Sequence, residues 1–274
     1  MRFLSGSARL AGVIGWPVAH SRSPRLHGIW LNRYGVDGAY LPLPVAPEHF
    51  ADTVRALRHA GFAGVNVTIP HKEAAFAVCD RLEPSALRAG AVNTLIFDGH
   101  GITGTNTDGY GFVANLSAHG IDPAAGPALI LGAGGAARAI AAALQDEGAA
   151  VTICNRSPER AAALATHLPP AKVLPWEQRA AALSEHALLV NTTSLGMAGH
   201  SPLDMPLDAA PAMLVVADIV YVPLTTPLLA AAAAQNLQAV EGLGMLLHQA
   251  VPGFAAWFGV TPAVDEELYR IVAA

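Results

Sequence analysis

The stretch "LILGAGGAAR", residues 129–138, restricts the fold of this chain more than any other segment. A short apolar run passes directly into a glycine-rich turn, and an alanine-rich segment typical of a helix follows. Dinucleotide-binding loops occur in this context, because glycines let the backbone approach a pyrophosphate and the helix N-terminus supplies N–H donors. Ala137 replaces a third glycine, which the pattern permits. We therefore expect a nucleotide-binding loop formed by Gly132, Ala133, Gly134, Gly135 and Ala136.

The segments around this loop predict a doubly wound parallel sheet. Short apolar runs alternate with longer amphipathic stretches, an order that favours strands joined by crossover helices. The runs are apolar throughout, as strands covered on both faces must be. They lie at residues 128–135, 149–156, 172–176, 187–194 and 213–221. We expect a Rossmann-like domain over residues 108–242.

The first hundred residues predict a second α/β domain. Strands are expected at 10–15, 39–45 and 64–69, and a hairpin-like pair within 91–106. Ser23 followed by Pro24 is typical of a capped helix start, and a second helix is expected before Gly61.

The last segments of the chain are expected to be helices that return to this first domain. No further strand follows them. The first domain then comprises residues 1–107 plus 243–274, and residues 242–249 form a hinge.

The end of the strand after the glycine loop predicts which dinucleotide binds. NAD-binding chains usually place an acidic residue there for the ribose 2′-hydroxyl. This chain has Asn155, Arg156 and Ser157 instead. A guanidinium can stack on adenine while it pairs with a 2′-phosphate, so the expected cofactor is NADP. Arg160, one helical turn further on, is either part of this pocket or an ordinary solvent-facing arginine.

Polar residues gather at the ends of the predicted strands of the first domain. Ser21 and Ser23 lie between a strand and a helix, where two hydroxyls can bind a small anion, or Ser23 can simply cap the helix. Asn66 and Thr68 share one side of a strand by its period of two, and Lys72 follows just beyond a proline.

Two further candidates, Asn93 and Asp108, are flanked by glycines at turns, where these residue types are also common for local reasons. Lys72 opens a predicted helix, an unfavourable place for a cation near the positive end of the helix dipole, which indicates function. His71 directly follows Pro70 and differs in direction from Lys72, so we assign it a structural role.

Composition excludes several classes of function. The net charge of -5 gives no basic field to hold a nucleic acid. Cys79 and Cys154 lack the spacing of a zinc site or disulfide framework and are expected to be reduced, buried thiols, and the histidines have no zinc-site spacing, so no metal is expected. We expect no secretory signal, and the apolar runs are shorter than the ~20 residues that a membrane span needs. We expect a cytoplasmic protein with a small-molecule substrate, no nucleic-acid or membrane partner, and an assembly compatible with a homodimer.

Taken together, these residues resemble the shikimate dehydrogenase family over nearly the whole chain. The shared motifs occur in family order: "HSRSPRLH", "NVTIPHK", "GAVNT", "TNTDG", "GAGGAAR", "CNRS", "NTTSLGM", "DIVYVPLTTPL" and "GLGMLLHQA". The resemblance implies two α/β domains with a cleft between them. It also implies the reversible NADPH-dependent reduction of 3-dehydroshikimate to shikimate, on the pathway towards chorismate and aromatic amino acids. One departure is Gly28, where the family usually has asparagine.

The resemblance also implies residue roles. Lys72 and Asp108 would form the catalytic pair, in which the carboxylate favours the ammonium form and the lysine passes a proton to the forming alkoxide. Substrate would be bound by Ser21, Ser23, Asn66, Thr68, Lys72, Asn93, Asp108, Tyr221 and Gln249. The nicotinamide half of the cofactor would be bound by Thr193, Ile219 and Gly242.

Three alternatives stay open at this point. A quinate/shikimate dehydrogenase of broader specificity is the nearest, although Asn155 and Arg156 do not suit NAD. A non-catalytic metabolite sensor is the second, although a pure binder need not keep both Lys72 and Asp108. A methylene-tetrahydrofolate dehydrogenase shares the two-domain plan but gives no reason for the paired serines Ser21 and Ser23.

Overall fold

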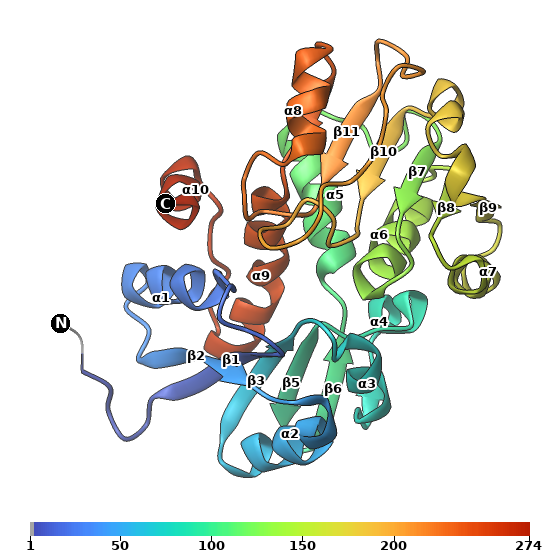
Figure 1. The fold of residues 1–274 in the computed structure, drawn as a ribbon. Helices are drawn as coiled ribbons and strands as arrows, with labels where there is room; N and C mark the ends of the chain where they lie inside the picture. The colour runs from blue at the N-terminus through green and yellow to red at the C-terminus, as the bar shows by residue number, and fades with distance from the viewer. Residues whose placement is uncertain (1–2) are drawn as a thin grey trace. The chain divides into compact units, whose positions relative to one another are not determined.

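The computed structural model describes residues 3–274, and the chain divides into two compact α/β units (Figure 1). Unit 1 runs to Asp108 and resumes at Leu247, and unit 2 comprises Gly109–Leu246. The second division falls inside helix α9 (Gly242–Phe258). Two α/β units, one of them Rossmann-like, confirm the predicted fold class. The hinge expected at residues 242–249 stays a prediction.

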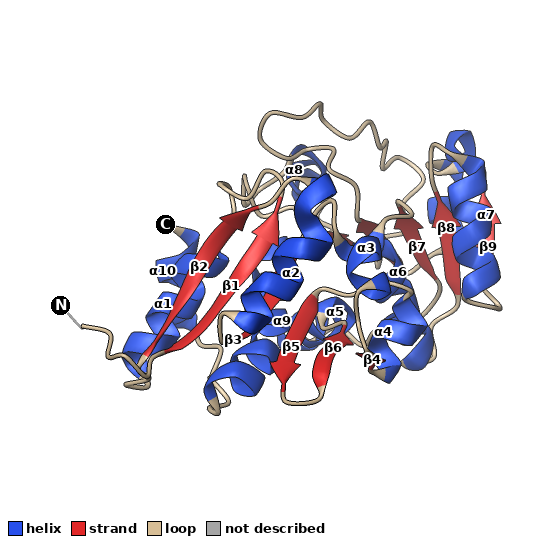
Figure 2. Ribbon diagram, turned by 90° about the horizontal axis from the view of Figure 1, so that it is seen from below, coloured by secondary structure: helices blue, strands red, loops and turns tan. Residues whose placement is uncertain are grey.

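Unit 1 contains a mixed six-stranded sheet of order β2-β1-β3-β5-β6-β4 (Figure 2). Strand β1 is parallel to β2 and β3, and β5 is antiparallel to both β3 and β6. The pair β5–β6 is the expected hairpin. The strands are β1 (Arg9–Gly15), β2 (Gly38–Pro44), β3 (Phe62–Val67), β4 (Arg81–Leu82), β5 (Thr94–Asp98) and β6 (Gly101–Thr105).

Helices cover both faces of this sheet. On one face, Phe50 and Val54 of α2 are buried with Val65 and Val67 of β3. On the other face, Trp30 of α1 lies among aromatic rings from α9. The helices of unit 1 are α1 (Ser23–Arg33), α2 (Phe50–His59), α3 (Lys72–Ala77), α4 (Pro84–Ala89), the second part of α9, and α10 (Glu266–Ala273). A 3-10 turn, η1 (Pro47–His49), precedes α2.

Two local predictions for unit 1 are wrong. Ser23 does not cap α1: it is the first helical residue, and Arg22 is the N-cap, whose side chain makes no capping hydrogen bond. The strand expected at 64–69 ends at Val67, because the chain turns at Thr68, whose carbonyl accepts a hydrogen bond from the His71 amide.

Unit 2 contains a wholly parallel six-stranded sheet of order β12-β11-β10-β7-β8-β9. This is the doubly wound arrangement, in which the strand order reverses beside β7. The strands are β7 (Ala128–Leu131), β8 (Val151–Cys154), β9 (Lys172–Leu174), β10 (Leu188–Asn191), β11 (Val215–Asp218) and β12 (Gln238–Val240). Only β12 had not been expected.

The helices of unit 2 cover both faces of its sheet. Alternate residues of β7 enter two different apolar clusters, Ile130 in one and Leu129 and Leu131 in the other. All three are fully buried, which confirms the prediction from the unbroken apolar runs. The helices are α5 (Asp108–Ala118), α6 (Gly135–Asp146), α7 (Pro158–His167) and α8 (Pro227–Ala234), with 3-10 turns η2 (Trp176–Gln178) and η3 (Ala181–Glu185).

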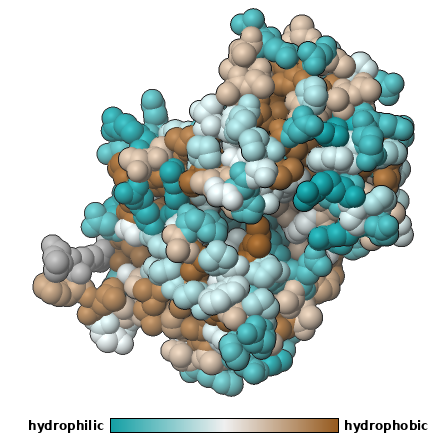
Figure 3. All heavy atoms as spheres, in the orientation of Figure 1, coloured by the Kyte–Doolittle hydropathy of each residue, from teal (hydrophilic) through white to brown (hydrophobic). Residues whose placement is uncertain are grey.

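The visible surface mixes hydrophilic and hydrophobic residues (Figure 3). The large apolar side chains that solvent reaches, such as Phe3, Leu87 and Met213, come from separate segments of the chain. Within residues 3–274, no helix combines the length and apolar character that crossing a membrane requires.

Candidate functional site

The pair Lys72–Asp108 is the centre of the polar site in unit 1. Lys72 opens α3 and Asp108 opens α5, and their Nζ and Oδ2 atoms are 2.5 Å apart. Their side chains are only 16% and 7% exposed. Limited access to water makes this pair unlike an exposed surface ion pair, whose charges solvent screens. The fold therefore brings together the two residues that were predicted to act as a pair.

Asn93 holds the other oxygen of Asp108. Its Nδ2 donates to Asp108 Oδ1 at 2.8 Å, while its Oδ1 accepts from the Thr107 amide at 2.9 Å. A backbone amide can only donate, so this contact fixes which end of the Asn93 amide faces Asp108. Asp108 consequently accepts at both oxygens, from Asn93 on one side and Lys72 on the other.

Gln249 of α9 completes this cluster. Asn93 Nδ2 lies 3.3 Å from Gln249 Oε1, and Thr107 Oγ1 lies 3.4 Å from the same atom. Sequence reasoning did not single out Thr107, which is 4% exposed and lies between Asn93 and Gln249. Its position directly before Asp108 in "TNTDG" was the available signal.

The remaining predicted substrate residues of unit 1 lie on separate segments. Asn66 is buried in β3, and its Nδ2 donates to the Asn93 carbonyl at 3.2 Å. Thr68 follows β3 and is partly exposed. Ser23 is buried at the start of α1, and its amide donates to Ser21 Oγ at 3.3 Å. Asn66 thus joins the cluster around Asn93.

His71 is buried beside Lys72 but contacts different groups. Its Nε2 lies 2.8 Å from the Val45 carbonyl oxygen, and its ring stacks on Phe50. Burial lowers the pKa of His71, and the hydrogen bond to the Val45 carbonyl opposes that shift. These contacts tie His71 to the loop after β2, in agreement with a structural role.

In unit 2, the glycine loop follows β7 and α6 begins at Gly135, as the motif predicts. Gly132 has φ of +118°, a conformation that side chains rarely adopt. Gly134 is the N-cap of α6, and no atom lies within 4 Å of the place where its Cβ would be. Open space at Gly134 and free N–H groups at a helix N-terminus suit an anion. Ala133 is buried and Ala136 partly exposed on the same turn.

The segment after β8 presents the expected polar residues. Arg156 and Arg160 are both exposed. Ser157 caps α7, where its Oγ accepts from the Arg160 amide and donates to Glu159 Oε2 at 2.8 Å. Asn155 Nδ2 donates to the Ser157 carbonyl at 3.0 Å. Sequence reasoning missed Glu159, whose carboxylate already engages the Ser157 hydroxyl.

The loops after β10 and β11 are joined by Asn191 and Asp218. Asn191 Oδ1 accepts from both the amide and the hydroxyl of Thr193, and Asn191 Nδ2 donates to Asp218 Oδ1 at 3.0 Å. Ile219 donates its amide to the Asn191 carbonyl. Burial raises the pKa of Asp218, although hydrogen bonds from Val220, Thr226 and Asn191 oppose this shift.

Gly242 and Tyr221 complete the predicted residues of unit 2. A Cβ on Gly242 would overlap the carbonyl of Ile219, so α9 begins in close backbone contact with the loop after β11. Tyr221 is partly exposed and follows this loop. Thr193, Ile219 and Gly242 are thus gathered within one region of unit 2.

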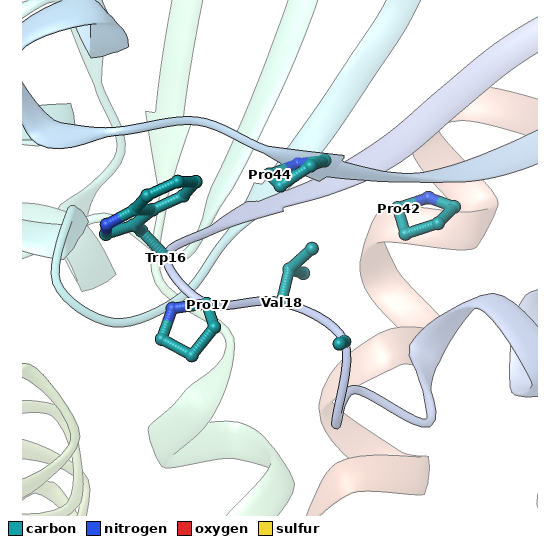
Figure 4. A pocket seen from close by; sticks show the side chains of 6 residues that line it. Trp16, Pro17, Val18, Pro42 and Pro44 are labelled. Atoms are coloured by element: carbon teal, nitrogen blue, oxygen red, sulfur yellow. The ribbon is translucent and has the colours of Figure 1, made fainter.

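Other features of the described chain offer fewer groups that could bind a ligand or react. An open, apolar pocket of about 510 Å³ in unit 1 is lined by Trp16, Pro17, Val18, Ala19, Pro42 and Pro44, and has no titratable group (Figure 4). Burial raises the pKa of Cys79 to about 12 and of Cys154 to about 11, so neither is a ready nucleophile. Cys154 is buried as expected, but Cys79 is only partly buried. Among residues 3–274, no group of three His, Cys, Asp or Glu residues could hold a metal ion.

Comparisons with known proteins show the family of this chain. The family model described as the shikimate dehydrogenase substrate binding domain matches residues 13–95, and the model described as shikimate / quinate 5-dehydrogenase matches residues 119–198. A shikimate dehydrogenase (NADP⁺) of Acidiphilium cryptum is 73% identical over 271 residues, covering 99% of this chain and 98% of the relative. One of Paramagnetospirillum magneticum is 58% identical, with 98% and 99% covered.

A solved structure extends the likeness to three dimensions. Shikimate 5-dehydrogenase of Thermus thermophilus, in complex with NADP(H) and shikimate, has a TM-score of 0.87 and 40% identity, covering 97% of this chain and 98% of that one. The chain belongs to the shikimate dehydrogenase family.

Proposed function

We propose that this chain is an NADP-dependent shikimate dehydrogenase, an oxidoreductase acting on a CH–OH group. It catalyses the reversible NADPH-dependent reduction of 3-dehydroshikimate to shikimate, on the pathway to chorismate and the aromatic amino acids. The observation that supports this most directly is the Lys72–Asp108 pair, with Nζ and Oδ2 2.5 Å apart, in a chain that matches shikimate dehydrogenases (NADP⁺) over nearly its full length.

The substrate residues follow from the family motifs and from the contacts in unit 1. Thr68, Asn93, Asp108 and Gln249 bind ring hydroxyls, and Asn93, Asp108 and Gln249 are already joined by hydrogen bonds. Ser21, Ser23 and Tyr221 bind the carboxylate. Asn66 contributes by holding the Asn93 backbone. Such pre-positioned polar groups favour one orientation of the substrate.

Lys72 acts at the reacting oxygen. Negative charge develops on that oxygen during reduction, and a nearby ammonium stabilises it and donates a proton to it. In the reverse direction Lys72 accepts the hydroxyl proton. Asp108, oriented by Asn93, keeps the lysine directed at one place. NADPH, when bound, supplies the hydride.

The cofactor residues of unit 2 fit NADP. The open space at Gly134 lies at the N-terminus of α6, where a pyrophosphate gains from N–H donors. Exposed Arg156 and Arg160 would bind the 2′-phosphate, with Asn155 and Ser157 beside them. Gly132, Ala133, Gly135 and Ala136 form the remainder of the loop, and Thr193, Ile219 and Gly242 hold the nicotinamide half.

A direct assay tests the function. Purified protein is mixed with shikimate or quinate and with NADP⁺ or NAD⁺, and formation of the reduced nicotinamide is followed by its absorbance. We expect the fastest reduction with shikimate and NADP⁺. Faster turnover of quinate would support the broader-specificity alternative, which is not favoured, and silence in all four mixtures would contradict the proposal in favour of a sensor.

Domain roles, location and assembly are part of the proposal. Residues 1–107 plus 243–274 form the substrate-binding catalytic domain, and residues 108–242 the NADP-binding domain. The protein acts in the cytoplasm on a small-molecule substrate, without a nucleic-acid, membrane or metal partner. A homodimer stays a prediction, which light scattering on the purified chain tests.

A further inference from the structure

The motif "HSRSPRLH" ends at His27, which the proposed chemistry does not use. Its ring is fully buried, and neither ring nitrogen has a hydrogen-bond partner within residues 3–274. The ring lies flat against Tyr40, with centroids 3.8 Å apart and planes 1° apart. Trp30, Phe254 and Trp257 surround it. This aromatic cluster confines the Tyr40 ring to one plane.

The Tyr40 hydroxyl leaves this cluster and reaches a residue of the site. It donates to Asn66 Oδ1 at 2.6 Å. Tyr40 pairs with Ala11 of β1, and Asn66 pairs with Val13, two residues further along the same strand. Side chains two residues apart point to the same face, so Tyr40 and Asn66 share a face with β1 between them. A long side chain is needed to span β1.

The orientation of the Asn66 amide, fixed by Tyr40, in turn restricts the position of Asn93. Because Tyr40 engages Asn66 Oδ1, the Asn66 Nδ2 faces β5, where it donates to the Asn93 carbonyl at 3.2 Å and to Thr94 Oγ1 at 3.0 Å. The Thr94 hydroxyl in turn donates to Asn93 Oδ1 at 2.9 Å. Asn93 is therefore held at both its backbone and its side chain, and its Nδ2 is left directed at Asp108.

We propose that Tyr40 is a positioning residue for substrate binding, which acts through Asn66 on Asn93 and so on the orientation of Asp108. Every donor in this series points towards Asp108, and all members are less than a tenth exposed. Buried hydrogen-bond networks of this kind restrict their members to one arrangement. Without the Tyr40 hydroxyl, the Asn66 amide is free to turn over, and Asn93 loses a fixed partner. The inference rests on the proposed function.

The test uses Tyr40→Phe, which keeps the ring in its aromatic cluster and removes only the hydroxyl. Tyr34→Phe is the matched control, because the Tyr34 hydroxyl also makes one hydrogen bond within unit 1, accepting from the Ala263 amide at 2.8 Å. We expect Tyr40→Phe to lower kcat/KM for shikimate about 3- to 10-fold, the range of one hydrogen bond, with the KM for NADP⁺ unchanged. Tyr34→Phe leaves both constants unchanged.

A second measurement tests whether Tyr40 acts through Asn66. In an Asn66→Ala background, Tyr40→Phe should have no further effect on kcat/KM, because the intermediate residue is already missing. Equal constants for Tyr40→Phe and Tyr34→Phe would overturn the inference, and so would a loss that persists in the Asn66→Ala background. Absence of shikimate-dependent NADP⁺ reduction by the unchanged chain would instead contradict the proposed function itself.

Discussion

Units 1 and 2 form their sites in different ways. In unit 1, side chains from β3, α3, α5 and α9 bond to one another around Asn93 and Asp108. In unit 2, the glycine loop offers backbone groups and open space at Gly134. A site made of side chains depends on the functional groups that those side chains carry. A site made of backbone depends on the absence of side-chain atoms that would block the ligand. The two units should therefore respond to opposite kinds of substitution.

Removing a functional group from unit 1 should have the largest effect. We expect Lys72→Ala to reduce kcat by about 10²- to 10⁴-fold, the usual contribution of acid–base catalysis, with a much smaller change in shikimate affinity. Lys172→Ala is the control, since Lys172 is the other lysine of the chain and is exposed on β9. Steady-state kinetics and calorimetric binding measure the two quantities. Equal kcat in both variants would contradict the proposed role of Lys72 as the proton donor and acceptor.

In unit 2, we expect cofactor selectivity to depend on the charge of Arg156 in addition to the backbone of the glycine loop. Arg156→Ala should raise the KM for NADP⁺ at least about 10-fold, because a charge-assisted hydrogen bond to the 2′-phosphate is lost, and should leave the KM for NAD⁺ unchanged. Arg55→Ala, another exposed arginine, serves as the control. If both cofactors were affected alike, the assignment of the 2′-phosphate to Arg156 would be wrong.

Alanine substitutions in the glycine loop of unit 2 should distinguish a glycine needed for folding stability from a glycine needed for cofactor binding. At Gly132, with φ of +118°, alanine is strained, so Gly132→Ala should lower the free energy of unfolding by about 1–3 kcal/mol. At Gly134 the space is open, so Gly134→Ala should leave stability nearly unchanged and raise the KM for NADP⁺ about 10-fold by crowding the pyrophosphate. Chemical denaturation and kinetics on both variants check this. A cofactor KM unaffected by Gly134→Ala would place the pyrophosphate elsewhere.

Acid should lower the folding stability of unit 1, because His27 is buried without charge. Burial lowers the pKa of His27 from 6.5 to about 3, so below pH 6.5 the unfolded chain binds a proton that the folded chain does not. The stability from this residue is therefore lost as the pH falls, by roughly 2 kcal/mol between pH 7 and 5. Burial lowers the pKa of His71 as well, so its contribution has the same sign.

In unit 2, the contribution of Asp218 to folding stability changes with pH in the opposite direction. Burial raises its pKa, so the folded state holds a proton more tightly than the unfolded state, and acid stabilises. Hydrogen exchange, read segment by segment at pH 7 and 5, should show unit 1 losing protection first. His27→Phe keeps an aromatic ring and should remove most of the pH dependence in unit 1. An unchanged pH dependence in that variant would rule out His27 as its source.

The sequence was most informative where the signal is local. The apolar runs of unit 2 correctly indicate β7, β8, β10 and β11, because burial on both faces leaves a continuous apolar pattern. The three-residue strand β12 (Gln238–Val240) is too short for any periodicity to show. The cap expected at Ser23 was wrong, because the same serine–proline order also suits a serine inside the first turn.

The site was only partly accessible from the sequence. Lys72 and Asp108 were identified as a pair from their motifs, and the structure brings their charged groups together. Thr107 could have been noticed from its place in "TNTDG", but the contact of Tyr40 with Asn66 joins strands far apart in the chain, so no local pattern could indicate it. Which oxygen of Asp108 faces which donor likewise follows only from tertiary hydrogen bonds.

The two lysines also have a practical consequence for attachment chemistry. Lys172 is exposed, whereas the Lys72 side chain is 16% exposed and paired with Asp108. An amine-reactive reagent used sparingly should modify Lys172 well before Lys72. Coupling through Lys172 would tether the protein to a support with Lys72 intact.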